Sequence, residues 1–389
     1  MHDSMRPIAT LHVDIEGGWG GSSRSLFELL SRVDRHRVSP VVVHRQSGPL
    51  TRWYADIGVP TYHVPEIGSF VPRGHNAMRN FVASLPRLAR LDSAARRIAM
   101  IAEANRTQLI HLNYEGLFLL ARRLRRLGIP MIAHSRAMVG ANRWGRWLAR
   151  SLAESVSHIF FISPQEEARF RQLLPGTNPP GGILWNISRP ALPRRPFADP
   201  PEVVSFGSID WVKGTDRLVH VARALRRGNA PALRIAIYGK ARTDRQFATE
   251  IEARIAAERL SDRIVLRGYT EDPMSAMAGA LALIRPSRDN DPWGRDVIEA
   301  AAAGLPVLAT GTFDGVIRDG ETGFLMREFD AEVVARRLAE LLAGRDAWQR
   351  MSEAAARRAE QCFSGRQQVE QFMSIVMRTI KSATTPGPR

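Results

Sequence analysis

Residues 285–304 read RPSRDNDPWGRDVIEAAAAG, and this stretch says most about the function of the chain. Asp291 and Glu299 lie eight positions apart, and a Pro-Trp-Gly turn directly follows Asp291. An alanine-rich run typical of a helix comes next and ends at Gly304-Leu305-Pro306. Polar groups therefore stand where a strand ends and a helix begins. In open α/β sheets, ligands bind at that edge.

Composition bounds the class of protein. The 389 residues, 44% of them hydrophobic, favour two domains with sizeable cores. The single cysteine, Cys362, argues against a disulfide framework and a cysteine-rich metal cage. We recognise neither a secretory leader nor an apolar window that could span a bilayer, so we expect a cytoplasmic protein.

The chain carries a formal net charge of +16. Such an excess indicates an anionic partner: a nucleotide, nucleic acid or an acidic membrane surface. A coding bias toward arginine is the competing explanation. Helix-turn-helix, zinc-finger and RNP motifs are not recognisable, so we do not expect nucleic acid as a partner.

The first half opens like a Rossmann-type unit. Residues 8–15 predict a buried strand, the glycine-rich loop 16–21 follows, and Ser22 or Ser23 can cap the next helix. Glycines let a backbone approach phosphate, and a helix N-terminus favours anions; a tight turn without a ligand is the alternative. The next strand ends in His44-Arg45-Gln46, without the acidic residue that a nicotinamide site needs, which argues against a dehydrogenase.

Further strands in this half end on polar residues. They are expected at 109–113, 130–135, 158–163 and 182–186. Each histidine among them, taken alone, is more typical of a packed or surface residue than of a catalytic one. Residues 136–150 combine four arginines with Trp144 and Trp147, which suits either a lipid headgroup surface or an ordinary helix with its tryptophans packed inward.

A proline-rich linker at 188–201 separates the halves, and the strand–helix alternation then restarts. Strands are expected at 203–207, 233–238, 264–266, 281–284 and 305–309, and residues 331–380 are expected to be helical. This pattern predicts an α/β protein with two doubly wound parallel sheets.

Several residues of the second half suit a diphosphate site. Lys213 and Arg242 lie on loops that follow strands, and Gly294 with Arg295 begins a helix. Glu299 could accept hydrogen bonds from ribose hydroxyls, and Asp291 could contact sugar hydroxyls. Asp289-Asn290-Asp291 has the D-x-D spacing of some metal-dependent transferases, but a further ligand cluster is not recognisable, so we expect no metal.

The stretch 291–307 resembles the E-P-F-G-x-x-x-x-E-A-x-A-x-G-x-P-V signature of group 1 glycosyltransferases. The loops Gly20-Gly21 and 207–214, the element Asp319–Gly323 and Asn186 are similar to further elements of that family. The resemblance implies a GT-B fold, in which two Rossmann-like domains face each other across a cleft. It also implies a retaining, metal-independent enzyme that takes a nucleotide-diphosphate sugar and needs no cofactor.

The resemblance also implies roles for individual residues. Lys213 would hold the donor diphosphate, Glu299 the ribose and Asp291 the sugar, while His134 would lie near sugar and acceptor. The implied catalytic residues are Asp291, Glu299, Lys213 and His134. The implied donor-binding residues are Gly20, Gly21, Ser208, Lys213, Arg242, Trp293, Gly294, Arg295 and Glu299. Ser208 replaces the family's arginine, Asp291 its glutamate and Trp293 its phenylalanine; Arg242 or Arg288 could supply the missing cation.

The implied organisation has four parts. Residues 1–190 form the acceptor-side domain, 200–365 the donor-side domain, 366–381 a helix that returns to the first domain, and 382–389 a tail. We expect sugar transfer to a glycan, lipid-linked or small-molecule acceptor in cell-surface polysaccharide or glycolipid biosynthesis, with peripheral contact to an anionic inner membrane face as a further option. A nucleotide-sugar-binding relative without catalysis and an epimerase of the same fold remain alternatives.

Overall fold

The computed structural model describes residues 6–71, 77–177, 179–228, 232–241, 245–288 and 293–384. The chain divides into two compact units. One comprises Met1–Ile187 together with Gly365–Arg389, and the other comprises Ser188–Ser364. The expected linker at 188–201 begins at the first boundary between them.

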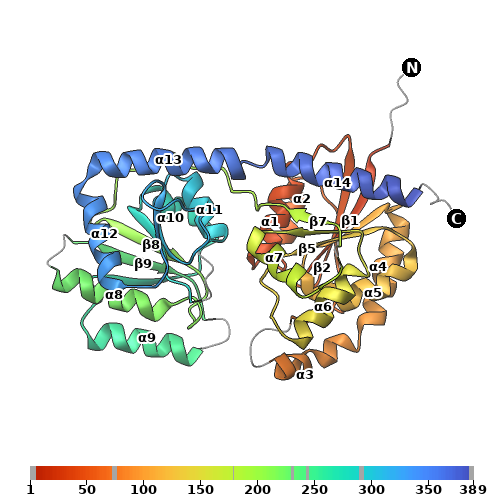
Figure 1. The fold of residues 1–389 in the computed structure, drawn as a ribbon, viewed down its shortest axis with the longest axis horizontal. Coiled ribbons are helices and arrows are strands. Elements are labelled where there is room, and N and C mark those ends of the chain that lie inside the picture. Colours follow the sequence, from red (N-terminus) through yellow and green to blue (C-terminus); the bar gives the residue numbers. More distant parts are fainter. Residues whose placement is uncertain are drawn as a thin grey trace, which may run out of the picture. The chain divides into compact units, whose positions relative to one another are not determined.

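The N-terminal unit contains a seven-stranded parallel sheet in the order β3-β2-β1-β4-β5-β6-β7. Its strands are β1 (Ile8–Asp14), β2 (Val38–His44), β3 (Thr61–His63), β4 (Leu109–Leu112), β5 (Met131–Ser135), β6 (His158–Phe161) and β7 (Gly181–Ile183). Its helices are α1 (Gly21–Leu30), α2 (Leu50–Asp56), α3 (Ala77–Leu88), α4 (Leu91–Ala104), α5 (Phe118–Leu124), α6 (Arg143–Ala153), α7 (Pro164–Gln172) and α14 (Arg366–Thr384). Helices therefore cover both faces of this sheet (Figure 1).

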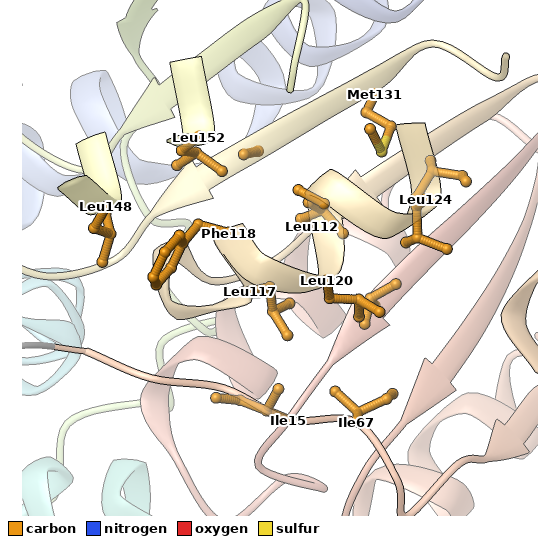
Figure 2. Packing of buried hydrophobic residues seen from close by; sticks show 14 of the residues in the cluster. Ile15, Ile67, Leu112, Leu117, Phe118, Leu120, Leu124, Met131, Leu148 and Leu152 are labelled. Carbon is orange, nitrogen blue, oxygen red and sulfur yellow. The ribbon is translucent and has the colours of Figure 1, made fainter. Parts of the chain in front are cut away.

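Alternate residues of the strands supply the two cores of this unit. On one face, Leu112 of β4 and Met131 of β5 pack against leucines of α5 and α6 (Figure 2). On the other face, Leu109 and Ile132 pack against α1 and against Phe372 of α14. A strand buried on both faces reads as a nearly continuous apolar run, which is why these strands were recognisable in the sequence.

The second unit contains a six-stranded parallel sheet in the order β10-β9-β8-β11-β12-β13. Its strands are β8 (Glu202–Phe206), β9 (Arg234–Tyr238), β10 (Ile264–Gly268), β11 (Ala282–Arg285), β12 (Val307–Thr310) and β13 (Gly323–Met326). Its helices are α8 (Thr215–Arg227), α9 (Arg245–Ala257), α10 (Pro273–Ala278), α11 (Arg295–Ala302), α12 (Ala331–Ala343) and α13 (Arg345–Phe363). The prediction of two doubly wound parallel sheets is confirmed.

Two edge strands were not predicted. β3 has the sequence Thr-Tyr-His and only three residues, and β13 follows a loop and begins at a glycine. Short edge strands lack the apolar run of a central strand, so their pairing is visible only in the folded sheet. Helix α14 also extends to Thr384, three residues beyond its expected end; residues 385–389 of the expected tail lie outside the described part.

Candidate active site

The strand order of the second sheet reverses between β8 and β11, and a small pocket lies at that point. It is lined by Ser205, Phe206, Gly207, Ser208, Lys213, Thr215, Leu218, Ile237, Arg285, Pro286 and Ser287. Most of these residues come from the carboxyl ends of β8 and β11 and from the loop before α8. The reversal point of an open parallel sheet is where such proteins bind ligands, so this pocket is the candidate site.

The loop that carries Lys213 is held in one conformation by its own residues. The backbone N–H of Lys213 donates to Asp210 Oδ1 at 2.7 Å, and the hydroxyl of Ser208 donates to the other oxygen of Asp210. Gly214 has a φ of 71°, and a Cβ built on it would lie 2.1 Å from the carbonyl oxygen of Pro286. Gly214 therefore lets the loop pack directly against the residues that follow β11.

Ser208 lacks the positive charge of the family's arginine, but it has a structural role in this loop. Its hydroxyl orients Asp210, which in turn orders the backbone at Lys213. Of the two arginines expected to compensate, Arg242 lies outside the described residues. Arg288 is engaged elsewhere: its two terminal nitrogens donate to Asp216 at 2.8 and 2.6 Å, and its guanidinium lies 4.5 Å from the ring centroid of Trp211.

The residues around the start of α11 form the second part of the site. Gly294 is the N-cap, and Trp293 before it is 2% exposed. Glu299 is 3% exposed, and its Oε1 lies 2.5 Å from Arg295 Nη2 and 3.2 Å from Arg189 Nε. Sequence reasoning missed Arg189, because a contact between the linker and a helix more than a hundred residues later has no local pattern. Asp291 lies outside the described residues.

Two buried hydroxyl groups at the same edge of the sheet were also missed. Ser287 Oγ follows β11 and Thr310 Oγ1 ends β12; within the described parts of the chain, neither has a hydrogen-bond partner. Ser287 is 1% exposed and Thr310 7%. Buried polar atoms normally have a partner, so the hydroxyl of Ser287, which lines the pocket, is a candidate to contact a ligand.

In the N-terminal unit, the glycine loop is clamped by a buried carboxylate. Asp14 Oδ2 accepts from the backbone N–H groups of Glu16 and Gly17 at 3.1 and 3.2 Å and from Ser23 Oγ at 2.5 Å. Asp14 Oδ1 accepts from Asn113 Nδ2 at 3.1 Å. These hydrogen bonds to Asp14 therefore fix the conformation of the loop.

Gly20 is the N-cap of α1 and Gly21 is its first residue, so the helix begins before Ser22 and Ser23, and the prediction that one of these serines caps it was wrong. The carboxylate of Glu16 contacts the hydroxyl of Ser22 in the first turn of α1. A Cβ on Gly20 would lie 1.9 Å from Oε2 of Glu16. In this structure Gly20 makes room for that carboxylate; the close approach of this loop to a phosphate stays a prediction.

His134 is part of a row of three buried histidines. The row begins at Thr10 Oγ1, which lies 2.9 Å from His12 Nε2; His12 Nδ1 lies 3.0 Å from His111 Nδ1, and His111 Nε2 lies 2.9 Å from His134 Nδ1. Burial lowers the pKa of His12 to about 3 and, with Arg136 next in importance, holds the pKa of His134 well below its usual range. His134 is 1% exposed, and its contact with a sugar or acceptor stays a prediction.

Arg136 directly follows the last residue of β5. Its side chain donates to Asn113 Oδ1 at 2.6 Å and to Asn186 Oδ1 at 2.8 Å, and its backbone N–H donates to Glu115. Asn186, the asparagine that the resemblance singled out, therefore takes part in a hydrogen-bond network at the carboxyl edge of the first sheet.

The tryptophans of α6 pack inward. Trp144 and Trp147 lie against the core, with Trp144 5.3 Å from Phe81 and Trp147 4.9 Å from Phe118 between ring centroids. Arg143, Arg146 and Arg150 on the same helix are exposed. Of the two interpretations of this segment, the ordinary amphipathic helix fits the contacts of the tryptophans.

The described residues contain no helix long and apolar enough to cross a membrane. They also contain no group of three or more His, Cys, Asp or Glu side chains arranged to hold a metal ion. The D-x-D triplet at 289–291 lies outside them.

Known structures share this fold over nearly the whole chain. The structure of HepE from Anabaena in complex with UDP and glucose superposes with a TM-score of 0.74 at 17% identity, covering 95% of this chain and 99% of that one. Sucrose-phosphate synthase from Thermosynechococcus elongatus gives a TM-score of 0.73 at 19% identity, with 97% and 100% covered. These similarities confirm the α/β fold of the GT-B class.

Similar sequences include two named transferases. A lipopolysaccharide core biosynthesis mannosyltransferase, LpcC, from Rhizobium leguminosarum bv. viciae is 26% identical over 233 residues, which is 58% of this chain and 64% of that protein. A D-inositol 3-phosphate glycosyltransferase from Nocardia farcinica is 33% identical over 156 residues, 39% of this chain and 35% of that protein. The chain thus matches less than two thirds of the length of either relative.

Two family models match the two halves of the chain. The glycosyl transferase 4-like domain matches residues 20–180, and glycosyl transferases group 1 matches residues 192–358. Together they include Gly20-Gly21, the Lys213 loop and the segment from Arg285 to Gly304, each of which had suggested the same family. The chain belongs to the group 1 glycosyltransferases.

Proposed function

We propose that this protein is a retaining glycosyltransferase that moves a sugar from a nucleotide-diphosphate sugar to a glycan, lipid-linked or small-molecule acceptor. The observation that carries the proposal is the pocket between β8 and β11, where Lys213 and Ser208 lie together at the reversal point of the sheet. Membership of the family and the buried Glu299 of α11 support it.

The proposed chemistry is positioning and charge stabilisation. Lys213 holds the donor diphosphate, and the N-terminus of α11 with Gly294 and Arg295 adds a positive dipole end. The buried side chain of Trp293 keeps the large apolar group that the family's phenylalanine supplies before α11. As the sugar leaves, negative charge grows on the diphosphate, and groups already in place stabilise it without reorganisation. We propose that this occurs without a metal or cofactor.

Glu299 and Asp291 hold the rest of the donor in this proposal. Glu299 accepts hydrogen bonds from the ribose, and Arg295 and Arg189 hold its carboxylate in position before the donor arrives. Asp291 contacts the sugar, with one methylene less than the family's glutamate. His134 contacts the sugar and the acceptor, and Gly20 and Gly21 let their loop approach the donor phosphate.

The setting is proposed from the relatives. LpcC is named for lipopolysaccharide core biosynthesis, so cell-surface polysaccharide or glycolipid biosynthesis is the proposed role. HepE was solved with UDP, so UDP is the first nucleotide to test.

We also propose a cytoplasmic location with peripheral contact to anionic membrane through the exposed Arg143, Arg146 and Arg150. Co-sedimentation with anionic vesicles but not with neutral ones is the expected result.

The proposal is tested by ligand binding followed by turnover. A panel of nucleoside diphosphates is screened by thermal shift, and donor hydrolysis and transfer are then measured with the matching nucleotide sugars. Lys213→Ala is expected to weaken nucleoside diphosphate affinity about tenfold or more. Arg227→Ala removes a charge at the other end of α8 and is expected to change nothing.

The outcomes separate the alternatives. Binding without hydrolysis or transfer would indicate a nucleotide-sugar-binding relative, the possibility that Ser208 raises. Interconversion of the donor sugar without transfer would indicate an epimerase. Absence of binding, together with no effect of Lys213→Ala, would contradict the proposal.

A further inference from the structure

The last residue of β11 is an arginine in an apolar strand. Ala282, Leu283 and Ile284 are fully buried core residues, and Arg285 after them is 8% exposed. A guanidinium buried to this degree is costly unless it is paired. Its partner is Asp296 in the first turn of α11, with Nη1 lying 2.7 Å from Oδ1 and 2.9 Å from Oδ2.

Arg285 lies in the candidate site. It lines the same pocket as Lys213 and Ser208. A Cβ built on Gly294 would lie 2.9 Å from Arg285 Nη1, so the guanidinium packs directly against the N-cap of α11. The positive charge of Arg285 therefore lies between the Lys213 loop and the start of α11, the two elements proposed to hold the donor diphosphate.

A second observation at this pocket points to a ligand. Ser287 lines the pocket two residues after Arg285, and its hydroxyl is buried without a hydrogen-bond partner among the described residues. A hydroxyl in that state costs free energy unless a ligand supplies the missing hydrogen bond. Phosphate oxygens are suitable acceptors for both a hydroxyl and a guanidinium.

We propose that Arg285, together with the hydroxyl of Ser287, binds a phosphate group of the donor and replaces the cation that the family resemblance places at Ser208. This inference rests on the proposed function, because it concerns the same donor site. Asp296 keeps the guanidinium in position when no donor is bound. A planar guanidinium matches the geometry of a phosphate, so this replacement is chemically closer to an arginine at 208 than a lysine would be.

Arg285 fits this role better than Arg288. Asp216 engages both terminal nitrogens of Arg288, and the carbonyl oxygen of Trp211 takes a further hydrogen bond from Nη1. Arg285 lines the pocket, whereas Arg288 is not among the residues that line it.

The test is calorimetric titration of the full-length protein with inorganic diphosphate, which avoids dependence on the unknown base. The double variant Arg285→Gln/Asp296→Asn exchanges the ion pair for a neutral pair of similar shape, so that no buried charge is left alone. We expect about tenfold weaker binding of diphosphate. Adding Ser208→Arg to this double variant is expected to restore most of the affinity.

The matched control is Arg288→Gln/Asp216→Asn, which removes the neighbouring ion pair and is expected to leave diphosphate affinity unchanged. Melting curves verify that all variants fold. Unchanged affinity in the Arg285 variant, or an equal loss in the Arg288 control, would overturn the inference. Ser287→Ala is expected to weaken binding by a smaller factor, about threefold.

The inference and the proposed function can fail separately. Binding that requires Lys213 but not Arg285 contradicts the inference alone. Binding that requires Arg285 in a protein that shows no transfer with any donor contradicts the proposed activity alone. A wild-type protein that binds no diphosphate contradicts both.

Discussion

Gly214 shows how one residue can fix the site. Its φ of 71° suits glycine, and a Cβ would lie 2.1 Å from the backbone oxygen of Pro286. Gly214→Ala should therefore destabilise the second unit by about 2–4 kcal/mol, since left-handed strain and overpacking add. Gly268→Ala is the matched control: its φ is 74°, but nothing lies within 4 Å of its Cβ, so we expect only about 1 kcal/mol. Urea unfolding compares the two, and equal effects would contradict the contact with Pro286.

Asp14 is a buried carboxylate that stabilises the glycine loop of the first unit. It is 0% exposed and accepts four hydrogen bonds that tie the glycine loop to β1, β4 and α1. Asp14→Ala leaves those donors buried, so we expect the N-terminal unit to lose about 3 kcal/mol or more. Asp92→Ala removes an exposed pair with Arg123 and should cost about 0.5 kcal/mol or less. Chemical denaturation followed on both variants checks the difference; a small effect of Asp14→Ala would show that water replaces the carboxylate.

Single residues also mark the limit of sequence-based prediction here. Lys213, Glu299 and the glycine loops were recognisable because their spacing follows the strand–loop–helix pattern. The partners of these residues were not: Ser208 with Asp210, Arg189 with Glu299 and Arg285 with Asp296 are pairs formed by packing. A sequence shows which residue types stand at the edge of a sheet. Which side chains then pair with one another depends on the geometry of the folded protein.

At the scale of elements, the histidine row joins β1, β4 and β5 beneath α14. His12 lies directly beside His111 in the register of β1 and β4, and the Phe372 ring of α14 lies 5.7 Å from His111 and 6.2 Å from His12. The folded pKa of His12 is about 3, against 6.5 for the ordinary side chain. Between these values the unfolded chain binds more protons, so stability falls as pH falls below about 6.5. Each such histidine contributes a slope of about 1.4 kcal/mol per pH unit.

Denaturation of the N-terminal unit between pH 8 and pH 4 measures this slope. Stability should be flat at the upper end, apart from other groups, and should drop steeply below pH 6.5. His12→Gln is expected to flatten the drop, because the side chain no longer titrates, whereas His36→Gln at an exposed position should leave it unchanged. Equal slopes in all three proteins would show that the row does not stay neutral.

The elements themselves were largely predictable, and the row was not. Central strands such as β4 and β5 reveal themselves as apolar runs, but which of their polar residues meet depends on register. Register is set when the strands pair, so three histidines from distant parts of the sequence form one row only in the sheet. The edge strands β3 and β13 were missed because pairing, rather than composition, defines them.

At the scale of the whole molecule, the first unit depends on the last helix of the chain. Phe372, Met373 and Val376 of α14 are almost fully buried against Leu29, Val33 and Leu184. Residues separated by more than three hundred positions thus share one core, and the chain passes from the first unit to the second and back. The sequence predicted a helix here, and the family resemblance suggested its return to the first domain.

Deleting residues 365–389 should therefore unfold or strongly destabilise the first half of the chain. Each buried apolar side chain of α14 stabilises the fold by about 1.5–3 kcal/mol, and three such losses approach the total stability of an ordinary domain. Hydrogen exchange resolved by peptide should show loss of protection in β1, β4 and β5, while β8 and β11 of the second unit stay protected. Phe372→Ala, which empties a fully buried position, should reproduce the effect in milder form, and Met377→Ala at a 42% exposed position of the same helix should not. Unchanged protection of the first sheet after the deletion would mean that its own helices suffice to stabilise it.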